Sequence, residues 1–177
     1  MVVIVILDHH VQIEETLDDC LRTIQDCHDD PRLKNLNALV LLMYKDRNKT
    51  GTLTTITDPS IYKKLIDRAE QLNVPLGYDS CSAFNYLRAI KDDEDFERKS
   101  QYVTSCCAAR SSCYIDVEMN YHVCSFLEGR EEWGEGISVL ECDDFIKDIW
   151  NNERTIEFRN RNIACGEKQS NPCNYFN

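Results

Sequence analysis

Apolar strands and amphipathic helices alternate along the first half of this chain, and this alternation restricts the fold more than any other feature. Strands are expected at three short, mostly apolar runs, Val2–Leu7, Leu36–Met43 and Val74–Tyr78. Helices are expected at residues 11–28, between Pro59 and Asn73, and at Cys81–Ile90. Consecutive strand–helix units of this kind form parallel strands joined by right-handed crossovers. The first half is therefore predicted to be α/β with a small parallel sheet.

The ends of the second helix carry the strongest local signals. Asp58 is a favourable N-cap residue, and Pro59 suits the first helical position because its missing N–H has no helical partner there. Asn73 is a plausible C-cap, and Pro75 follows it. These residues predict where the helix begins and ends.

The second half is organised around a predicted β-hairpin at Ser112–Phe126, with Cys113 before its first strand and Cys124 ending its second. Two short helices are expected after it, at Asp143–Trp150 and Glu153–Asn162. A charged segment, KDDEDFERKS, separates the two halves. We therefore expect an α/β domain at 1–95 and a small, cysteine-rich α+β domain at 96–177.

The charge and composition exclude several classes of partner. A net charge of −11 argues against electrostatic binding to nucleic acid or to an anionic membrane surface. No apolar run approaches the roughly 18 residues of a membrane helix, and the start, MVVIVILDHH, lacks the basic region of a signal peptide. We therefore expect a cytoplasmic protein whose ten cysteines are reduced.

The cysteines fall into two groups. Cys20 and Cys27, on the first predicted helix, are expected to pack as small apolar side chains. Six others lie in loops, hairpin ends and an irregular tail: Cys106, Cys107, Cys113, Cys124, Cys165 and Cys173. Disulfide, metal and core roles are all open to these six, and reduced thiols favour metal or core. Loops can place several cysteine sulfurs close enough to bind one metal ion or cluster, as zinc and iron–sulfur sites require. The chain, however, has no CxxC pair.

A second candidate site lies beyond the carboxyl ends of the predicted parallel strands, where ligands bind in α/β folds. Its predicted substrate-binding residues are Lys45, Arg47, Asp79, Ser80 and Cys81. The alternative for each is a solvated loop residue. No residue is assigned a catalytic role, because none of the four histidines is evidently paired with Cys81 as a base.

The run CCAARSSCYIDVEMNYHVCSF, residues 106–126, resembles the SPASM/twitch auxiliary-cluster region of radical S-adenosylmethionine (SAM) enzymes. Glu157-Phe158-Arg159, followed by Cys165 and Cys173, resembles the end of that region. The resemblance implies that the first half is three βα units of an incomplete, partial TIM-like barrel, followed by a SPASM/twitch-like domain. It also implies a [4Fe–4S] auxiliary cluster held by Cys106, Cys124, Cys173 and one further thiol.

Departures from the family pattern shape what can be expected of the chain. The CxxxCxxC motif that holds the SAM-cleaving cluster is missing, so SAM would bind only with a partner that supplies the missing half. Ala109 and Met119 stand where the pattern has glycines, and His122 stands near its usual proline. A tight hairpin turn often needs positive φ, which a non-glycine residue adopts at a cost.

Three parallel strands cannot close a barrel, so the strand Val2–Leu7 would offer an unpaired edge. We therefore expect a homodimer or a protein that supplies the missing half. The chain is predicted to bind an iron–sulfur cluster and to be inactive alone. The alternative is a non-catalytic remnant, with structural zinc or no metal, that acts as a protein-interaction module.

Overall fold

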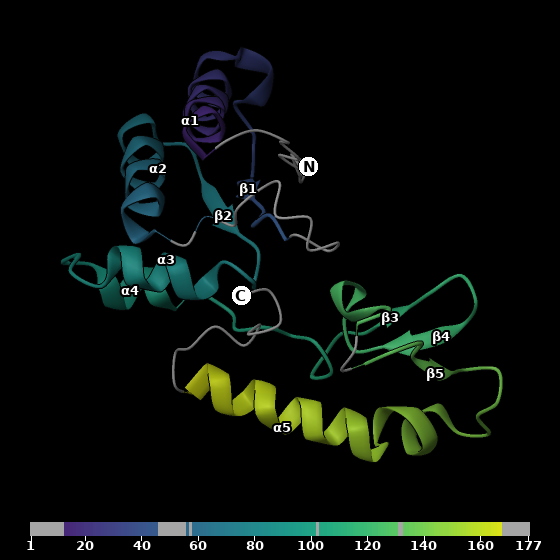
Figure 1. The fold of residues 1–177 in the computed structure, drawn as a ribbon. Helices are drawn as coiled ribbons and strands as arrows, with labels where there is room; N and C mark the ends of the chain where they lie inside the picture. The colour runs from purple at the N-terminus through teal and green to yellow at the C-terminus, as the bar shows by residue number, and fades with distance from the viewer. Residues whose placement is uncertain (1–12, 46–55, 57, 102, 131–132, 168–177) are drawn as a thin grey trace. The chain divides into compact units, whose positions relative to one another are not determined.

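The computed structural model of the chain describes residues 13–45, 56, 58–101, 103–130 and 133–167 (Figure 1). The chain divides into two compact units, one ending at Ser105 (unit 1) and one beginning at Cys106 (unit 2). Both combine helices with short strands, so the protein is mixed α/β, with a small parallel sheet in unit 1 and a small antiparallel sheet in unit 2. The two described sheets form no closed barrel.

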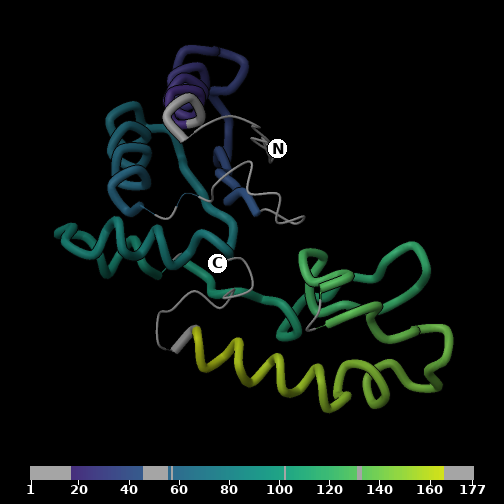
Figure 2. Tube along the Cα trace, viewed as in Figure 1, coloured from purple at the N-terminus to yellow at the C-terminus, as the bar shows by residue number. Residues whose placement is uncertain are grey.

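Unit 1 has the predicted alternation of helices and strands. Its path runs through α1 (Ile13–Asp29), β1 (Leu39–Leu41), α2 (Pro59–Leu72), β2 (Leu76–Tyr78), α3 (Ala83–Ile90) and α4 (Phe96–Ser100), as Figure 2 traces, with a 3₁₀ turn at Pro31–Leu33. β1 and β2 pair in parallel, with Leu39 opposite Leu76. The parallel pairing is confirmed, and both strands are shorter than predicted. The expected strand Val2–Leu7 lies outside the described residues.

The main core of unit 1 lies between α1, α2 and the two strands. Ile24 of α1 and Leu39 of β1 have no exposed surface, and Leu65 of α2 packs into the same cluster. Cys20 and Cys27 are buried there too, which confirms their predicted packing role. Burial raises the pKa of the Cys20 thiol to about 11, with a smaller contribution from Asp19, so this thiol is neutral at physiological pH.

The ends of α2 form as their local signals predict. The Asp58 carboxylate accepts a hydrogen bond from the Ser60 N–H at 2.8 Å, and Pro59 occupies the first turn. Asn73 adopts the left-handed conformation with φ of 54°, and its N–H donates to the carbonyl groups of Ala69 and Glu70. These contacts satisfy backbone groups that the helix ends would otherwise leave unpaired.

Unit 2 is built on a three-stranded antiparallel sheet in the order β3–β4–β5. Its elements are β3 (Tyr114–Ile115), β4 (Asn120–His122), a 3₁₀ turn (Ser125–Leu127), β5 (Ile137–Ser138), a π-helix (Phe145–Trp150) and α5 (Glu153–Glu167). Tyr121 of β4 is fully buried, with the rings of Trp133, Phe145 and Trp150 6.0–6.5 Å away. These aromatic contacts form the core of the unit.

The helix predicted at Asp143–Trp150 is present, as a π-helix over Phe145–Trp150. Asp144 caps its start by accepting hydrogen bonds from the N–H groups of Ile146 and Lys147. At its end, the Asn151 N–H donates to the Ile146 carbonyl, five residues back, at 2.9 Å. No helix in the described part of the chain combines the length and apolar composition that crossing a membrane requires.

Two neighbouring leucines, one at the end of β1 and one just after it, give a matched test of the unit 1 core. Leu41 is buried, whereas Leu42 is 38% exposed. We expect Leu41→Ala to lower the free energy of unfolding by about 3 kcal/mol, because it leaves a cavity in the core. Leu42→Ala should cost less than about 1 kcal/mol. Urea unfolding followed by far-ultraviolet circular dichroism measures both, and equal losses would contradict the described core.

Candidate functional site

In unit 1 the carboxyl ends of β1 and β2 bring a buried ion pair together. The Lys45 Nζ lies 2.8 Å from Asp79 Oδ2, and the two side chains are 5% and 17% exposed. Lys45 follows β1, and Asp79 directly follows β2. Because parallel strands end at the same edge of a sheet, these residues meet although they are far apart in sequence.

The other carboxylate oxygen of Asp79 organises the turn into α3. Asp79 Oδ1 accepts hydrogen bonds from the Ser82 N–H at 3.1 Å and from the Ser82 hydroxyl at 2.5 Å. The Met43 N–H, after β1, approaches the same oxygen at 3.4 Å. Asp79 therefore ties the chain after β1 to the start of α3.

Lys45 remains a cation in this buried position. Burial alone would lower the pKa of its ammonium group, but the hydrogen bond and charge of Asp79, together with the Cys81 thiol, outweigh burial and raise it. The Lys45 ammonium also donates to the Met43 carbonyl at 3.3 Å, so its contacts hold the segment after β1 to the segment after β2.

The structure thus brings together three of the five residues predicted to bind substrate: Lys45, Asp79 and Cys81. Ser80, which lies between Asp79 and Cys81 in sequence, is half-buried. Arg47 lies outside the described residues. Sequence reasoning missed Ser82, which is buried. Its spacing of three residues from Asp79, at the start of a helix, is the signal that could have identified it.

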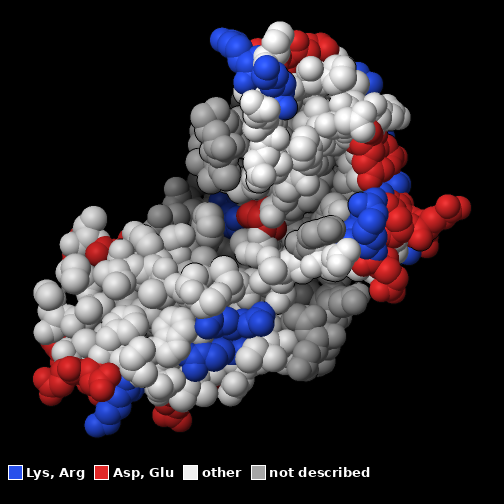
Figure 3. Space-filling model, turned by 180° about the vertical axis from the view of Figure 1, so that it is seen from behind, with Lys and Arg blue, Asp and Glu red and all other residues white. Residues whose placement is uncertain are grey.

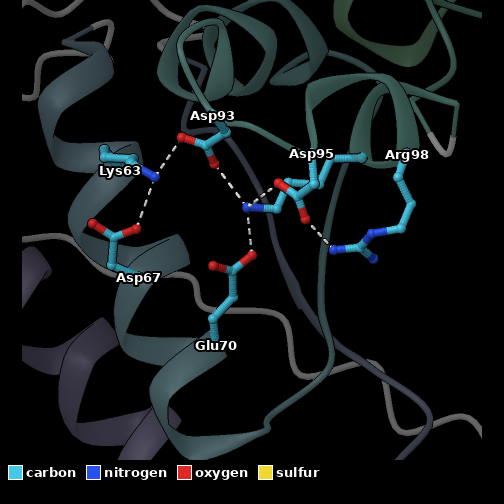
Figure 4. A network of polar contacts seen from close by, with 7 residues as sticks. Lys63, Asp67, Glu70, Asp93, Asp95 and Arg98 are labelled. Atoms are coloured by element: carbon cyan, nitrogen blue, oxygen red, sulfur yellow. Dashed lines mark hydrogen bonds and ion pairs between the residues drawn. The ribbon is translucent and has the colours of Figure 1, made fainter.

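A second polar cluster in unit 1 links α2 to α4 (Figure 4). The Lys99 Nζ lies 2.6 Å from Glu70, 2.7 Å from Asp93 and 3.1 Å from Asp95. Asp93 also pairs with Lys63 at 2.6 Å. Burial alone would raise the pKa of Asp93, but its hydrogen bonds to the two lysines hold that pKa below its usual range.

An open hollow of about 430 Å³ adjoins this cluster, lined in part by Glu70, Asp95 and Arg98. All three of these charged side chains are in ion pairs. Acidic and basic side chains are interleaved along one edge of unit 1, as Figure 3 shows. The charged segment that separates the two predicted domains therefore serves to hold helices together.

In unit 2 the helix α5 holds the turn that carries Cys106. The Asn162 amide donates to the carbonyl groups of Cys106 at 3.1 Å and Ala108 at 2.9 Å. The Arg159 Nε donates to the Ala109 carbonyl at 2.6 Å. Cys106 and Asn162 are both buried. Sequence reasoning missed Asn162, because nothing local in an exposed-looking helix marks a buried polar contact.

The structure distributes the six candidate metal ligands unevenly. Cys106 is buried, Cys107 and Cys113 are exposed, Cys124 and Cys165 are half-buried, and Cys173 lies outside the described residues. The structure joins no two of the described cysteines in a disulfide. Within the described residues, no three His, Cys, Asp or Glu side chains are placed to hold one metal ion. The described residues alone therefore do not form a complete metal site.

The hairpin holds a buried histidine–carboxylate pair. The His122 Nε2 lies 2.8 Å from Asp116 Oδ2, and the Asn120 N–H donates to Asp116 Oδ1 at 2.8 Å. The hydrogen bond from His122 lowers the pKa of Asp116, and Asn120 adds to this effect. Gly136 lies against His122, where an added Cβ would come within 2.8 Å of the ring. The sequence identified His122 by its position but not its partner.

Two turn positions in unit 2 have the left-handed backbone conformation. Ala109 has φ of 57° and Met119 has φ of 64°. The Met119 N–H donates to the Asp116 carbonyl at 3.1 Å, so Asp116–Met119 is a tight turn that ends in a left-handed residue. The hairpin turn therefore has the positive φ that tight turns often need, at a methionine.

Comparison of the chain with protein-family models, with curated proteins and with solved structures gave no match.

The ion pair at the strand ends gives a test of the unit 1 site. Asp79→Asn removes the negative charge but keeps an oxygen that can accept from Ser82. It leaves the Lys45 ammonium buried without its counter-charge, so we expect a loss of about 3 kcal/mol in the free energy of unfolding. The double variant Lys45→Met/Asp79→Asn should recover part of that loss, because it removes the buried charge as well.

The matched control is Asp92→Asn, at a carboxylate whose side chain is 87% exposed. It should change the free energy of unfolding by less than about 0.5 kcal/mol. Urea titration of the four proteins measures these values. A double variant less stable than Asp79→Asn alone would contradict the assignment of a coupled pair.

Proposed function

We propose that this chain is a radical-SAM-like protein that lacks the SAM-cleaving half and carries an auxiliary iron–sulfur cluster on the thiols of unit 2. The observation that carries the proposal is the left-handed conformation of Ala109 and Met119. Both residues stand where the resembled region has glycine, and left-handed backbone is the property for which glycine is selected. A backbone that keeps this conformation without glycine supports a shared turn geometry.

The arrangement of the thiol-bearing segments adds support. Tyr114 of β3 pairs with His122 of β4, so residues just before β3 lie beside residues just after β4. Ser112 precedes β3 and forms a bridge to Ala108, close in sequence to Cys106. Cys124 follows β4. The hairpin pairing therefore directs the segments that carry Cys106 and Cys124 toward the same end of the sheet.

The described residues supply only part of a ligand set, because no three of them converge on one point. Cys106 and Cys124 are the ligands we propose from this part, with Cys173 in the segment outside it and one of Cys107, Cys113 and Cys165 as the fourth. When bound, such a cluster would relay electrons, anchor a substrate or cross-link and stabilise the fold. No reaction step is assigned to it.

Unit 1 fits the later part of a partial TIM-like barrel in this proposal, since its β1 and β2 are parallel and connected through α2. Lys45, Asp79, Ser80 and Cys81 would then face a substrate at the strand ends, with Arg47 from the segment outside the described residues. SAM would bind only when a second copy of the chain, or a separate protein, supplies the missing half of the barrel. We place the chain in the cytoplasm in this proposal, where cysteines that bind a metal cluster are kept reduced.

Metal analysis after anaerobic purification and reconstitution tests the proposal. We expect about four iron and four sulfide per chain, with broad visible absorbance. Cys106→Ala and Cys124→Ala should each reduce both contents, because each removes a thiolate ligand. Cys142→Ala is the matched control, since the Cys142 thiol donates to the Val139 carbonyl at 3.1 Å and is not a proposed ligand. Equal cluster content in all four proteins would contradict the ligand assignment.

A second candidate function is a non-catalytic remnant that mediates protein contacts, with structural zinc or no metal. It is favoured by the lack of any converging set of three ligands among the described residues. The same analysis separates the two. Zinc without sulfide, or no metal in a folded protein, would favour the second candidate and end the iron–sulfur proposal.

A further inference from the structure

The turn of the β3–β4 hairpin carries several exposed apolar side chains. Val117 is 90% exposed, Ile115 and Met119 are each 40% exposed, and Leu140 is 73% exposed. The Val139 N–H donates to the Met119 carbonyl at 2.8 Å, so Leu140 lies next to the turn although it follows β5. We call these four residues, Ile115, Val117, Met119 and Leu140, the hairpin patch.

The conformation of Met119 sets this patch apart from ordinary exposed apolar residues. Its φ of 64° lies in the left-handed region, which glycine adopts at no steric cost and methionine does not. The hairpin turn requires this conformation, and glycine would meet the requirement without strain. The Met119 side chain is 40% exposed, so it is available for contact with another molecule.

Three exposed carboxylates lie close in sequence to the residues of the hairpin patch. Glu118 lies in the turn, and Glu141 and Asp143 follow Leu140 in sequence; all three are exposed. Within the described residues, none of these three carboxylates has an ion-pair partner. An apolar patch with unpaired acidic groups at its margin is complementary to an apolar segment that carries lysine or arginine.

We propose that the hairpin patch is a docking site for a segment of a different protein, with apolar side chains flanked by basic ones. A second copy of this chain fits poorly, because it would bring the same carboxylates and a net charge of −11 to the contact. An anionic membrane is repelled for the same reason. The inference does not rest on the iron–sulfur proposal and holds with or without a metal in unit 2.

Fluorescence anisotropy with labelled synthetic peptides tests the docking site on the full chain. The probe is an amphipathic peptide of leucine and lysine, and the comparison peptides replace lysine by glutamate or leucine by serine. We expect the leucine–lysine peptide to bind most tightly, because it alone supplies both apolar contacts and basic charge. Amide chemical shifts in a ¹⁵N-labelled protein should move at Ile115–Asn120 and at Val139–Glu141.

Two variants locate the contact. Val117→Ser and Met119→Gly should each weaken binding by about ten-fold, as for loss of one anchor side chain. Met119→Gly should also raise the urea midpoint, because glycine relieves the left-handed strain. This combination of a more stable fold and weaker binding would not follow from a structural role. Ile156→Ser on α5 is the matched control, since Ile156 is 39% exposed and lies outside the patch.

The outcomes are decisive in either direction. Unchanged affinity in Val117→Ser and Met119→Gly, or an equal loss in Ile156→Ser, would overturn the proposal. So would equal binding of the leucine–glutamate peptide. Self-association of the wild-type chain that Val117→Ser abolishes, seen by light scattering, would assign the patch to a second copy and would also overturn it.

Discussion

The structure of unit 2 depends on the hydrogen bonds that α5 donates to the turn at Cys106–Ala109. Asn162 and Arg159 together satisfy the carbonyl groups of Cys106, Ala108 and Ala109. Buried carbonyls without donors would each cost about 1–3 kcal/mol, so these contacts fix where the turn can lie. The same Arg159 also donates to the Trp150 carbonyl at 2.6 Å. One helix therefore positions both the thiol-bearing turn and an aromatic residue of the core.

Unit 1 uses one carboxylate in a similar way. Asp79 joins the segment after β1 to the start of α3 by pairing with Lys45 and capping Ser82. A two-stranded sheet has few backbone hydrogen bonds of its own, so such side-chain contacts contribute much of its stability. In both units, a polar side chain from one element organises the backbone of another. Those are the two places where the candidate sites lie.

Local signals allowed much of the fold to be predicted. Asp58, Pro59 and Asn73 act through residues within one turn of themselves, so the bounds of α2 could be read directly. The hairpin could be located from its strand pattern, and its turn was expected to need positive φ. The π-helix could not be foreseen, because its pattern of apolar residues also fits an α-helix.

The contacts that define the sites could not be predicted, because their partners are distant in sequence. Asn162 meets Cys106 across more than 50 residues, and Lys45 meets Asp79 across 34. Arg159 could be singled out from the sequence, but its carbonyl acceptors came only from the structure. Asp116 and His122 lie close in sequence, yet their pairing depends on the hairpin register.

Hydrogen exchange measured by mass spectrometry tests most directly whether α5 fixes the thiol-bearing turn. Asn162→Leu removes the amide donor, and Asn160→Leu is the matched control on the exposed face of the same helix. We predict that Asn162→Leu speeds amide exchange at Cys106–Ser112 by about ten-fold or more, as for loss of buried hydrogen bonds, and that Asn160→Leu leaves it unchanged. Wild-type exchange of that turn in Asn162→Leu would contradict the dependence of unit 2 on these contacts.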